Sequence, residues 1–226
     1  MRTAICCAGT GRCIDYTIEN LQENLFYDDS VDVYLYLTKE NNTNYVKEKF
    51  LNISNINIFI NKEDHIPIDN IKFQYNWPPS IQTDYNKGRQ IYVQMLRSRY
   101  ILGQLINLNS VKYDRVLFSR IDVVYEKPIF NILDTLDIDD ETIYVPNFHH
   151  WGGINDRFAY STHSGMVDYF NLYKHMDKLI NNNHIFHAES TLKEYMEDIN
   201  KIVKQCAVRF CRIRNGELHD KFLHLR

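Results

Sequence analysis

The sequence predicts an α/β fold with a mostly parallel central sheet flanked by helices. Strand-like and helix-like segments alternate over the first 60 residues, and a long helix followed by an apolar strand comes later. Parallel strands need a crossover connection, which is usually a helix, so this order favours a parallel sheet.

The first half of the chain supplies five elements in the order strand, helix, strand, helix, strand. The run VDVYLYL alternates in the manner of a half-buried strand, and TAICCA and NINIFI are short apolar runs. The expected bounds are 3–8, 14–25, 31–37, 43–51 and 55–60. The polar segment 61–86, with three prolines, is expected to be a long loop, and such loops are often functional.

The second half begins with a strong helix and continues with shorter elements. Helices are expected at 88–108 and 164–179, and another begins at 190–195. Strands are expected at 115–118, with 123–125 as an extension, and at 143–146, 157–161 and 203–213. Because no linker, repeat or low-complexity block interrupts the chain, we expect residues 1–226 to form a single domain.

Charge and hydropathy narrow the class of protein. The formal net charge is -3, whereas nucleic-acid-binding proteins usually carry a basic surplus, so no nucleic-acid partner is expected. The first apolar run, residues 4–8, is too short for a signal peptide or a membrane span, and no other stretch reaches spanning length. The sequence therefore predicts a cytoplasmic protein, whose five cysteines we expect to be reduced thiols.

A charged pair follows the apolar strand at 115–118. Ligands of open α/β sheets bind beyond the carboxyl ends of strands, where Asp122 is expected to lie. A carboxylate there can hold a divalent cation that neutralises a diphosphate. Arg120 lies two residues earlier and can pair with a phosphate or with Asp122. From these residues alone, a structural Arg–Asp pair is the better-supported interpretation.

The loop HHWGGINDR, residues 149–157, is a second candidate site. Gly152 and Gly153 allow the backbone to approach a ligand closely, and Trp151 offers a flat face for a sugar ring. Asn155 and Asp156 offer hydrogen-bonding groups for hydroxyls. The structural alternative is a tight turn in which these two residues cap the next element.

Three weaker candidates complete the set. Glu189, in the segment HAE before a helix, either takes a proton from an acceptor hydroxyl or only caps the helix. Gly9, Thr10 and Arg12 follow the first strand and could meet a nucleotide, although they form no dinucleotide-binding or Walker motif. Arg97 shares one helix face with two glutamines, and this grouping fits contact with a ligand and a solvated face equally well.

Taken in order, these segments resemble small nucleotide-diphospho-sugar glycosyltransferases of bacteria and large DNA viruses. The resemblance spans nearly the whole chain and consists of the start AGTGR, the Gln- and Arg-bearing helix, SRIDVVYEKP, the WGGINDRFAY loop and HAESTLKEYM. It implies a GT-A fold, a Rossmann-like nucleotide-sugar domain. The implied function is hexosyl transfer from a nucleotide-diphosphate donor such as a UDP-hexose to a glycan or other hydroxyl acceptor.

The resemblance also implies roles for individual residues. Asp122 looks like the last acid of the metal-binding D-x-D motif, which implies Mn²⁺ or Mg²⁺, but Arg120 replaces the first acid. Asn155 and Asp156 look like the donor-sugar loop, and Glu189 falls near the expected position of the anomeric carbon. We therefore assign Glu189 and Asp156 to catalysis. The residues expected to bind the donor are Gly9, Thr10, Arg12, Arg97, Arg120, Asp122, Gly153 and Asn155.

Two other functions fit the same residues. A sugar nucleotidyltransferase shares the α/β fold and the use of a metal, but normally has a Gly-rich, basic signature of which AGTGR is a thin version. A catalytically inactive sugar-binding module would keep Trp151 and Asn155 without turnover. The donor sugar, the acceptor, the stereochemical outcome and the oligomeric state cannot be inferred from the sequence.

Overall fold

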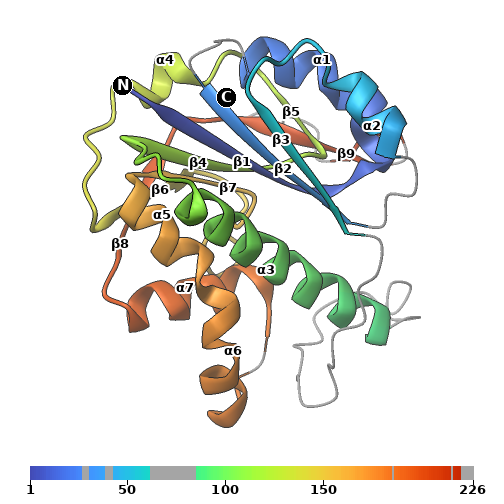
Figure 1. The fold of residues 1–226 in the computed structure, drawn as a ribbon. Helices are drawn as coiled ribbons and strands as arrows, with labels where there is room; N and C mark the ends of the chain where they lie inside the picture. Colours follow the sequence, from blue (N-terminus) through green and yellow to red (C-terminus); the bar gives the residue numbers. More distant parts are fainter. Residues whose placement is uncertain (27–30, 39–42, 62–84, 185, 215, 220–226) are drawn as a thin grey trace, which may run out of the picture.

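The structure, a computed structural model, describes residues 1–26, 31–38, 43–61, 85–184, 186–214 and 216–219. It confirms the expected fold class, because a seven-stranded, mostly parallel sheet lies between two layers of helices (Figure 1). The polar segment expected at 61–86 falls mainly on residues 62–84, which lie outside the described residues.

The large sheet has the strand order β3-β2-β1-β4-β7-β6-β8. Strand β1 pairs in parallel with β2 and β4, β2 with β3, and β6 with β8, while β7 is antiparallel to both of its neighbours. The bounds are β1 Thr3–Thr10, β2 Val31–Thr38, β3 Ile56–Asn61, β4 Arg115–Arg120, β6 Thr142–Pro146, β7 Phe158–Ser161 and β8 Ile202–Cys206.

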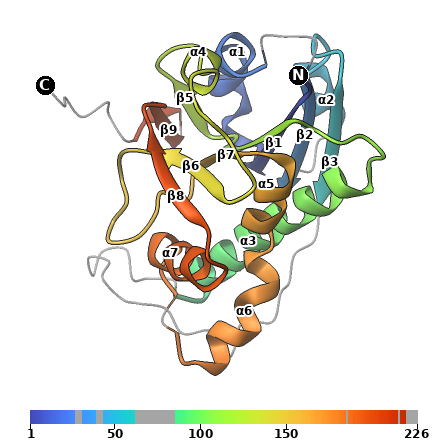
Figure 2. The ribbon, with the colours of Figure 1, turned by 90° about the vertical axis from the view of Figure 1, so that its left-hand side faces the viewer.

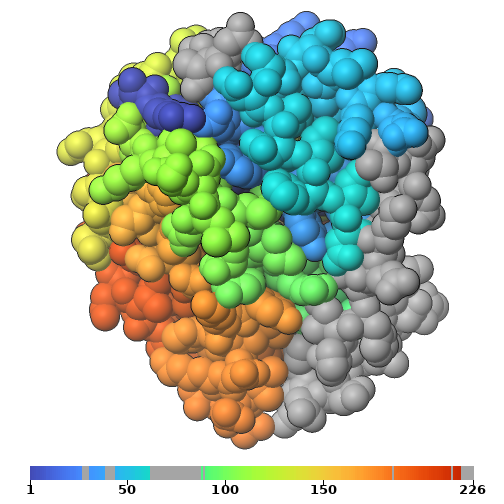
Figure 3. All heavy atoms as spheres, in the orientation of Figure 1, coloured from blue at the N-terminus to red at the C-terminus, as the bar shows by residue number. Residues whose placement is uncertain are grey.

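Helices cover both faces of this sheet. One face carries α1 (Ile14–Asn24), α2 (Thr43–Lys49) and the short α4 (Phe130–Leu133). The other carries α3 (Tyr85–Leu108), α5 (His163–Phe170), α6 (Leu172–Asn181) and α7 (Ala188–Asp198). In the space-filling view, the green side chains of α3 run between the cyan strand region and the orange helices α5 and α6 (Figure 3).

The period of two along a strand explains how one sheet supports two cores. In β1, Ile5 and Cys7 pack with the α1 side, whereas Ala4 and Cys6 pack with the α3 side. Both faces of the strand are apolar because both are covered, as is typical of parallel sheets. All five cysteines are free and buried, in agreement with the expected thiols.

The structure corrects the strand expected to continue through 123–125. Ile121 and Asp122 form a turn, and β5 (Val123–Tyr125) leaves the large sheet to pair with β9 (Phe210–Arg214). The expected strand at 203–213 is likewise two strands, because β8 stays in the large sheet and β9 joins a three-stranded sheet with β5 and β10 (Glu217–Leu218).

The helix expected at 164–179 is also two helices. Thr162 begins α5, and its hydroxyl accepts a hydrogen bond from the backbone N–H of Gly165 at 3.2 Å. At Asn171 the backbone ψ is 0°, and this residue ends α5 and precedes the first residue of α6. Helix α4 was not expected at all, since four residues are too few for a helical repeat to show. Among the described residues, no helix is long and apolar enough to span a membrane.

Candidate functional site

The candidate residues gather at the carboxyl edge of the large sheet. Strand β1 ends at Gly9 and Thr10, and β4 ends at Arg120 beside it. The 147–157 loop joins β6 to β7 and returns at the same edge, since β7 is antiparallel to β4 and the N–H of Arg120 donates to the carbonyl of Arg157 at 3.2 Å. This is the edge at which ligands of open α/β sheets bind.

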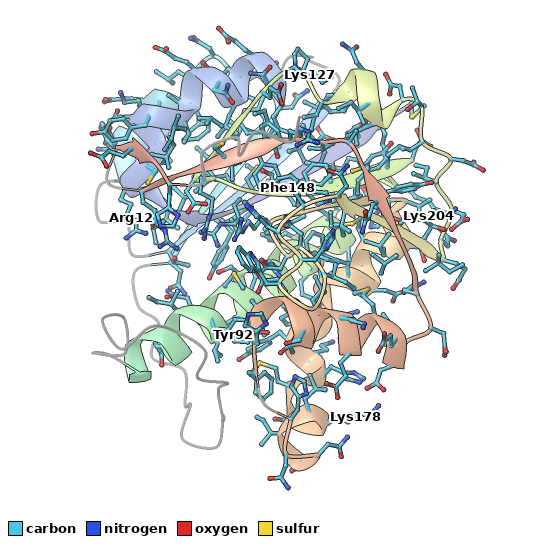
Figure 4. The ribbon with its side chains drawn as sticks, turned by 180° about the vertical axis from the view of Figure 1, so that it is seen from behind. Arg12, Tyr92, Lys127, Phe148, Lys178 and Lys204 are labelled. Carbon is cyan, nitrogen blue, oxygen red and sulfur yellow. The ribbon has the colours of Figure 1, made fainter. Side chains whose placement is uncertain are left out.

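Gly9 allows the turn after β4 to pack closely on β1. Its φ is +156°, and a Cβ at this position would lie 2.5 Å from the Ile121 side chain. The N–H of Ile121 also donates to the carbonyl of Ala8 at 3.1 Å. Thr10 is half-buried, and Arg12 is exposed on the one-turn helix η1 (Gly11–Cys13) at the rim below α1 (Figure 4).

Arg120 and Asp122 form a two-pronged ion pair. Nε of Arg120 donates to Oδ1 of Asp122 at 2.7 Å, and Nη2 donates to Oδ2 at 2.6 Å. The Asp122 side chain is 9% exposed and that of Arg120 is 25% exposed. Burial alone would raise the pKa of Asp122, but the charges of Arg120 and Arg212 outweigh it and lower the pKa.

The β6–β7 loop is held by its own polar groups. The Asn155 side chain is fully buried, donates to the carbonyl of Phe148 at 2.8 Å and accepts from the N–H of Arg157 at 2.9 Å. This bracing agrees with the structural alternative for Asn155, and a contact between its side chain and a donor stays a prediction. Trp151 is 63% exposed and stacks on the His149 ring at 5.6 Å.

The loop is pressed against the start of α7. The N–H of Ile154 donates to the carbonyl of Glu189 at 2.9 Å. A Cβ on Gly153 would lie 2.1 Å from the carbonyl carbon of Glu189, so only glycine permits this approach. The yellow β6–β7 segment accordingly lies against α7 beyond the sheet edge (Figure 2). Two segments that are far apart in the sequence therefore meet at Gly153 and Glu189.

Asp156 lies in a buried ion pair with α3. Nη2 of Arg99 donates to Oδ2 of Asp156 at 2.7 Å, and both side chains are less than a tenth exposed. Burial alone would raise the pKa of Asp156, but the charges of Arg99, Arg120 and Arg157 lower it. Asp156 is thus a fixed negative charge in the interior, and its catalytic assignment stays a prediction.

Glu189 has the most unusual acid–base environment of the site. Burial, and next the negative charge of Asp156, raise its pKa from 4.5 to about 7. Arg157 and Arg212 act in the opposite direction, and Nε2 of His187 lies 3.4 Å from its carboxylate. A carboxyl group whose pKa lies near neutrality is suited to take or give a proton.

Solved structures show what this architecture resembles. The chain matches the apo-form glycosyltransferase GlyE of Streptococcus pneumoniae TIGR4 with a TM-score of 0.55 and 13% identity, over 90% of this chain and 45% of that one. It matches the galactosyltransferase LgtC, solved with donor and acceptor sugar analogs, with a TM-score of 0.55 and 12% identity, over 89% of this chain and 72% of LgtC. The sequence matches no protein-family model and no curated protein.

The chain has a GT-A glycosyltransferase fold. At this identity the likeness concerns the fold, and the chain spans less than half the length of GlyE. The expectation of a GT-A fold is therefore confirmed, whereas the roles of individual residues stay predictions.

The GT-A resemblance implies a divalent cation, which would need unoccupied carboxylate oxygens at Asp122. Magnesium and manganese favour carboxylate oxygens, yet both oxygens of Asp122 already accept from Arg120. No three His, Cys, Asp or Glu residues in the described part of the chain lie together as a metal site would require. Within the described ranges, the side chains around Asp122 do not fit a cation held by the protein.

The arginine of α3 that contacts the β6–β7 loop is Arg99, which was not among the predicted site residues, and the assignment of Arg97 to donor binding stays a prediction. Arg99 reaches Asp156, whereas Arg97, two positions earlier, is half-buried on another side of the helix. A three-and-four spacing pattern favoured Arg97 because it groups polar residues. The partner of Arg99 is 57 residues away, so no local pattern could show it.

Proposed function

We propose that the chain is a hexosyltransferase that moves a sugar from a nucleotide-diphosphate donor, such as a UDP-hexose, to a glycan or other hydroxyl acceptor. The observation that carries this proposal is the meeting of Glu189 with the β6–β7 loop at the edge where β1 and β4 end. The GT-A fold supports it independently.

In this proposal, the arginines at the sheet edge bind the donor and Glu189 acts on the acceptor. Arg12 and Arg120 lie at the ends of the two central strands, where a donor diphosphate binds in open α/β sheets. Glu189 then orients the acceptor hydroxyl and takes its proton, since its pKa of about 7 suits a base near neutrality. Asp156 acts on this base through its charge, because it is one cause of the raised pKa.

The direct test is donor binding followed by donor hydrolysis. We expect UDP-hexoses to raise the melting temperature, because a ligand at about 100 times its Kd stabilises a fold by about 2.7 kcal/mol. We then expect slow release of free hexose and UDP. A panel in which no UDP-sugar shifts the melting temperature would contradict the proposal.

A sugar-binding module without activity is the second candidate, and Trp151 is the observation that favours it. Its ring is mostly exposed yet ordered by stacking on His149, and both residues have a positive φ, at 46° and 54°. Such left-handed backbone is costly for non-glycine residues and is often retained at ligand sites. Sugar binding without release of hexose from any UDP-sugar would favour this candidate.

Gly153→Ala is expected to lower turnover more than tenfold. The added methyl group would overlap the Glu189 backbone and push the loop away from α7, and small displacements of catalytic groups can cost about 100-fold. Gly152→Ala is the matched control, because a Cβ there meets nothing within 4 Å. The φ of +81° at Gly152 means that alanine there costs on the order of 1 kcal/mol of backbone strain, but this change does not displace Glu189. Equal turnover in both variants, measured per folded molecule, would contradict the role of this contact.

A further inference from the structure

We propose that this chain needs no divalent cation to bind its donor, because the Arg120–Asp122 pair and the arginines around it supply the positive charge that the diphosphate requires. The inference rests on the proposed function, since it concerns the diphosphate of that donor. It differs from what the GT-A resemblance implies, which is a metal ion held at Asp122.

The geometry of the pair gives the first reason. A metal ion would need the oxygens of Asp122, and both of them already accept charged N–H groups of Arg120 at 2.7 and 2.6 Å. Two parallel hydrogen bonds of this kind are among the stronger polar contacts in proteins. A cation that displaced Arg120 would also place two positive charges side by side.

Exposure gives the second reason. The Asp122 side chain is 9% exposed, whereas the Arg120 side chain is 25% exposed. A ligand that arrives at this edge therefore meets the cationic partner in preference to the anionic one. A planar guanidinium suits phosphate oxygens, which it can contact with two N–H groups at once.

The charge of the whole site gives the third reason. The groups within electrostatic reach of Cys13, Asp122, Asp156 and Glu189 include five arginines against two aspartates, a difference of +3. When Glu189 is ionised, as its proposed role as a base requires, three acids stand against the five arginines and the difference is +2. The arginines are Arg12, Arg99, Arg120, Arg157 and Arg212. This surplus is opposite in sign to the charge of a nucleoside diphosphate, so it favours binding of that group without a metal ion.

The arginines that give this surplus of positive charge are positioned by elements of the fold. Arg120 comes from β4 and Arg212 from β9, and the charges of both act on Asp122. Arg12 comes from η1 and acts, together with Asp122 and Arg120, on the neighbouring Cys13. The carbonyl of Asp122 itself accepts the N–H of Ile213 at 2.8 Å, so β9 is held at this point. Two separate strands thus place cations at the Asp122 carboxylate, and η1 adds a third cation beside Cys13.

The test is calorimetric titration of the full chain with UDP, once in EDTA and once with Mn²⁺. We expect the two Kd values to agree within about threefold, a difference below 1 kcal/mol. Binding that is seen only with Mn²⁺ would overturn this inference and leave the proposed function standing. Absence of UDP binding under both conditions would overturn both.

Arg120→Asp gives the reciprocal test, because it restores two acids with one residue between them. We expect this variant to lose at least about tenfold in UDP affinity in EDTA and to recover it with Mn²⁺. Mn²⁺ bound by the protein alone, followed by electron paramagnetic resonance, should appear in the variant and not in the unaltered chain. Mn²⁺ binding by the unaltered chain at this site would overturn the inference.

Lys174→Asp on α6 is the control with the same change of charge. Lys174 lies over the Tyr100 ring, outside the group of arginines. The UDP affinity of the Lys174→Asp variant should therefore show no new dependence on Mn²⁺. A new dependence in this control equal to that of Arg120→Asp would overturn a local role for Arg120. If Arg120→Asp does not fold, the comparison of EDTA with Mn²⁺ in the unaltered chain decides the question.

Discussion

Glu189→Gln is expected to lower glycosyl transfer by about 10²–10⁴ while leaving the fold and donor binding intact. The change keeps the shape of the side chain but removes its ability to take a proton. The loss should appear in kcat with little change in the KM for the donor, since the proposed role begins once both substrates are bound. Steady-state kinetics with a transferable UDP-hexose measures it.

The same substitution should also stabilise the protein above neutral pH. The pKa of Glu189 is about 7 in the folded chain and has an ordinary value of 4.5, so the folded state holds a proton that the unfolded state releases between these values. The free energy of unfolding therefore falls by on the order of 1–3 kcal/mol as pH rises from 4.5 to about 7. Above pH 7 this whole loss of stability remains, because Glu189 is then ionised in both states. Glutamine carries no charge at any of these pH values and avoids the cost.

These two effects together distinguish a catalytic Glu189 from a helix cap. A cap that interacts with the dipole of α7 is charged and stabilising, so its loss would lower the melting temperature and spare turnover. Glu197→Gln is the control on the same helix, because Glu197 is exposed and pairs only weakly with Lys193 at 3.8 Å. Unchanged turnover with a lower melting temperature in Glu189→Gln would reject the proposed role.

The alternation of strands and helices was sufficient to predict an α/β fold with a mostly parallel sheet and the edge at which the candidate site lies, whereas the GT-A type was implied by the resemblance. Asp122, Arg120 and the β6–β7 loop follow apolar strands closely, so their positions depend on contacts near in sequence. The partition of short segments between two sheets was not predictable, because β5 and β9 are 85 or more residues apart and their pairing is a tertiary contact.

The close contacts within the candidate site also could not be predicted from the sequence. Gly153 was noted as a glycine that allows close approach, but the atoms that approach it belong to Glu189, 36 residues later. The contact between Gly153 and Glu189 therefore supports a role of the HAE segment in the candidate site, which the composition of that segment alone did not indicate. For the same reason, the R-x-D triplet showed a departure from D-x-D but not that Arg120 would occupy both oxygens of Asp122.

Arg99→Met is expected to destabilise the protein by about 3–5 kcal/mol, the largest effect on stability among these variants. The Arg99 side chain is 3% exposed, and its guanidinium pairs with Asp156 and lies 4.8 Å from the Phe118 ring centre. Its removal leaves the buried charge of Asp156 without its partner. Chemical denaturation measures the loss, and Lys178→Met, which breaks an exposed pair with Asp198, should cost no more than about 1 kcal/mol.

The pH dependence and a double variant show whether the uncompensated charge is the cause. The deficit of Arg99→Met should shrink as pH falls toward the ordinary aspartate pKa of 3.8, because a protonated Asp156 no longer needs a cation. Combining Arg99→Met with Asp156→Leu should recover much of the stability, since Met packs well against aromatic rings and no buried charge remains. A deficit that is equal at all pH values and additive in the double variant would instead mean that Arg99 contributes through packing alone.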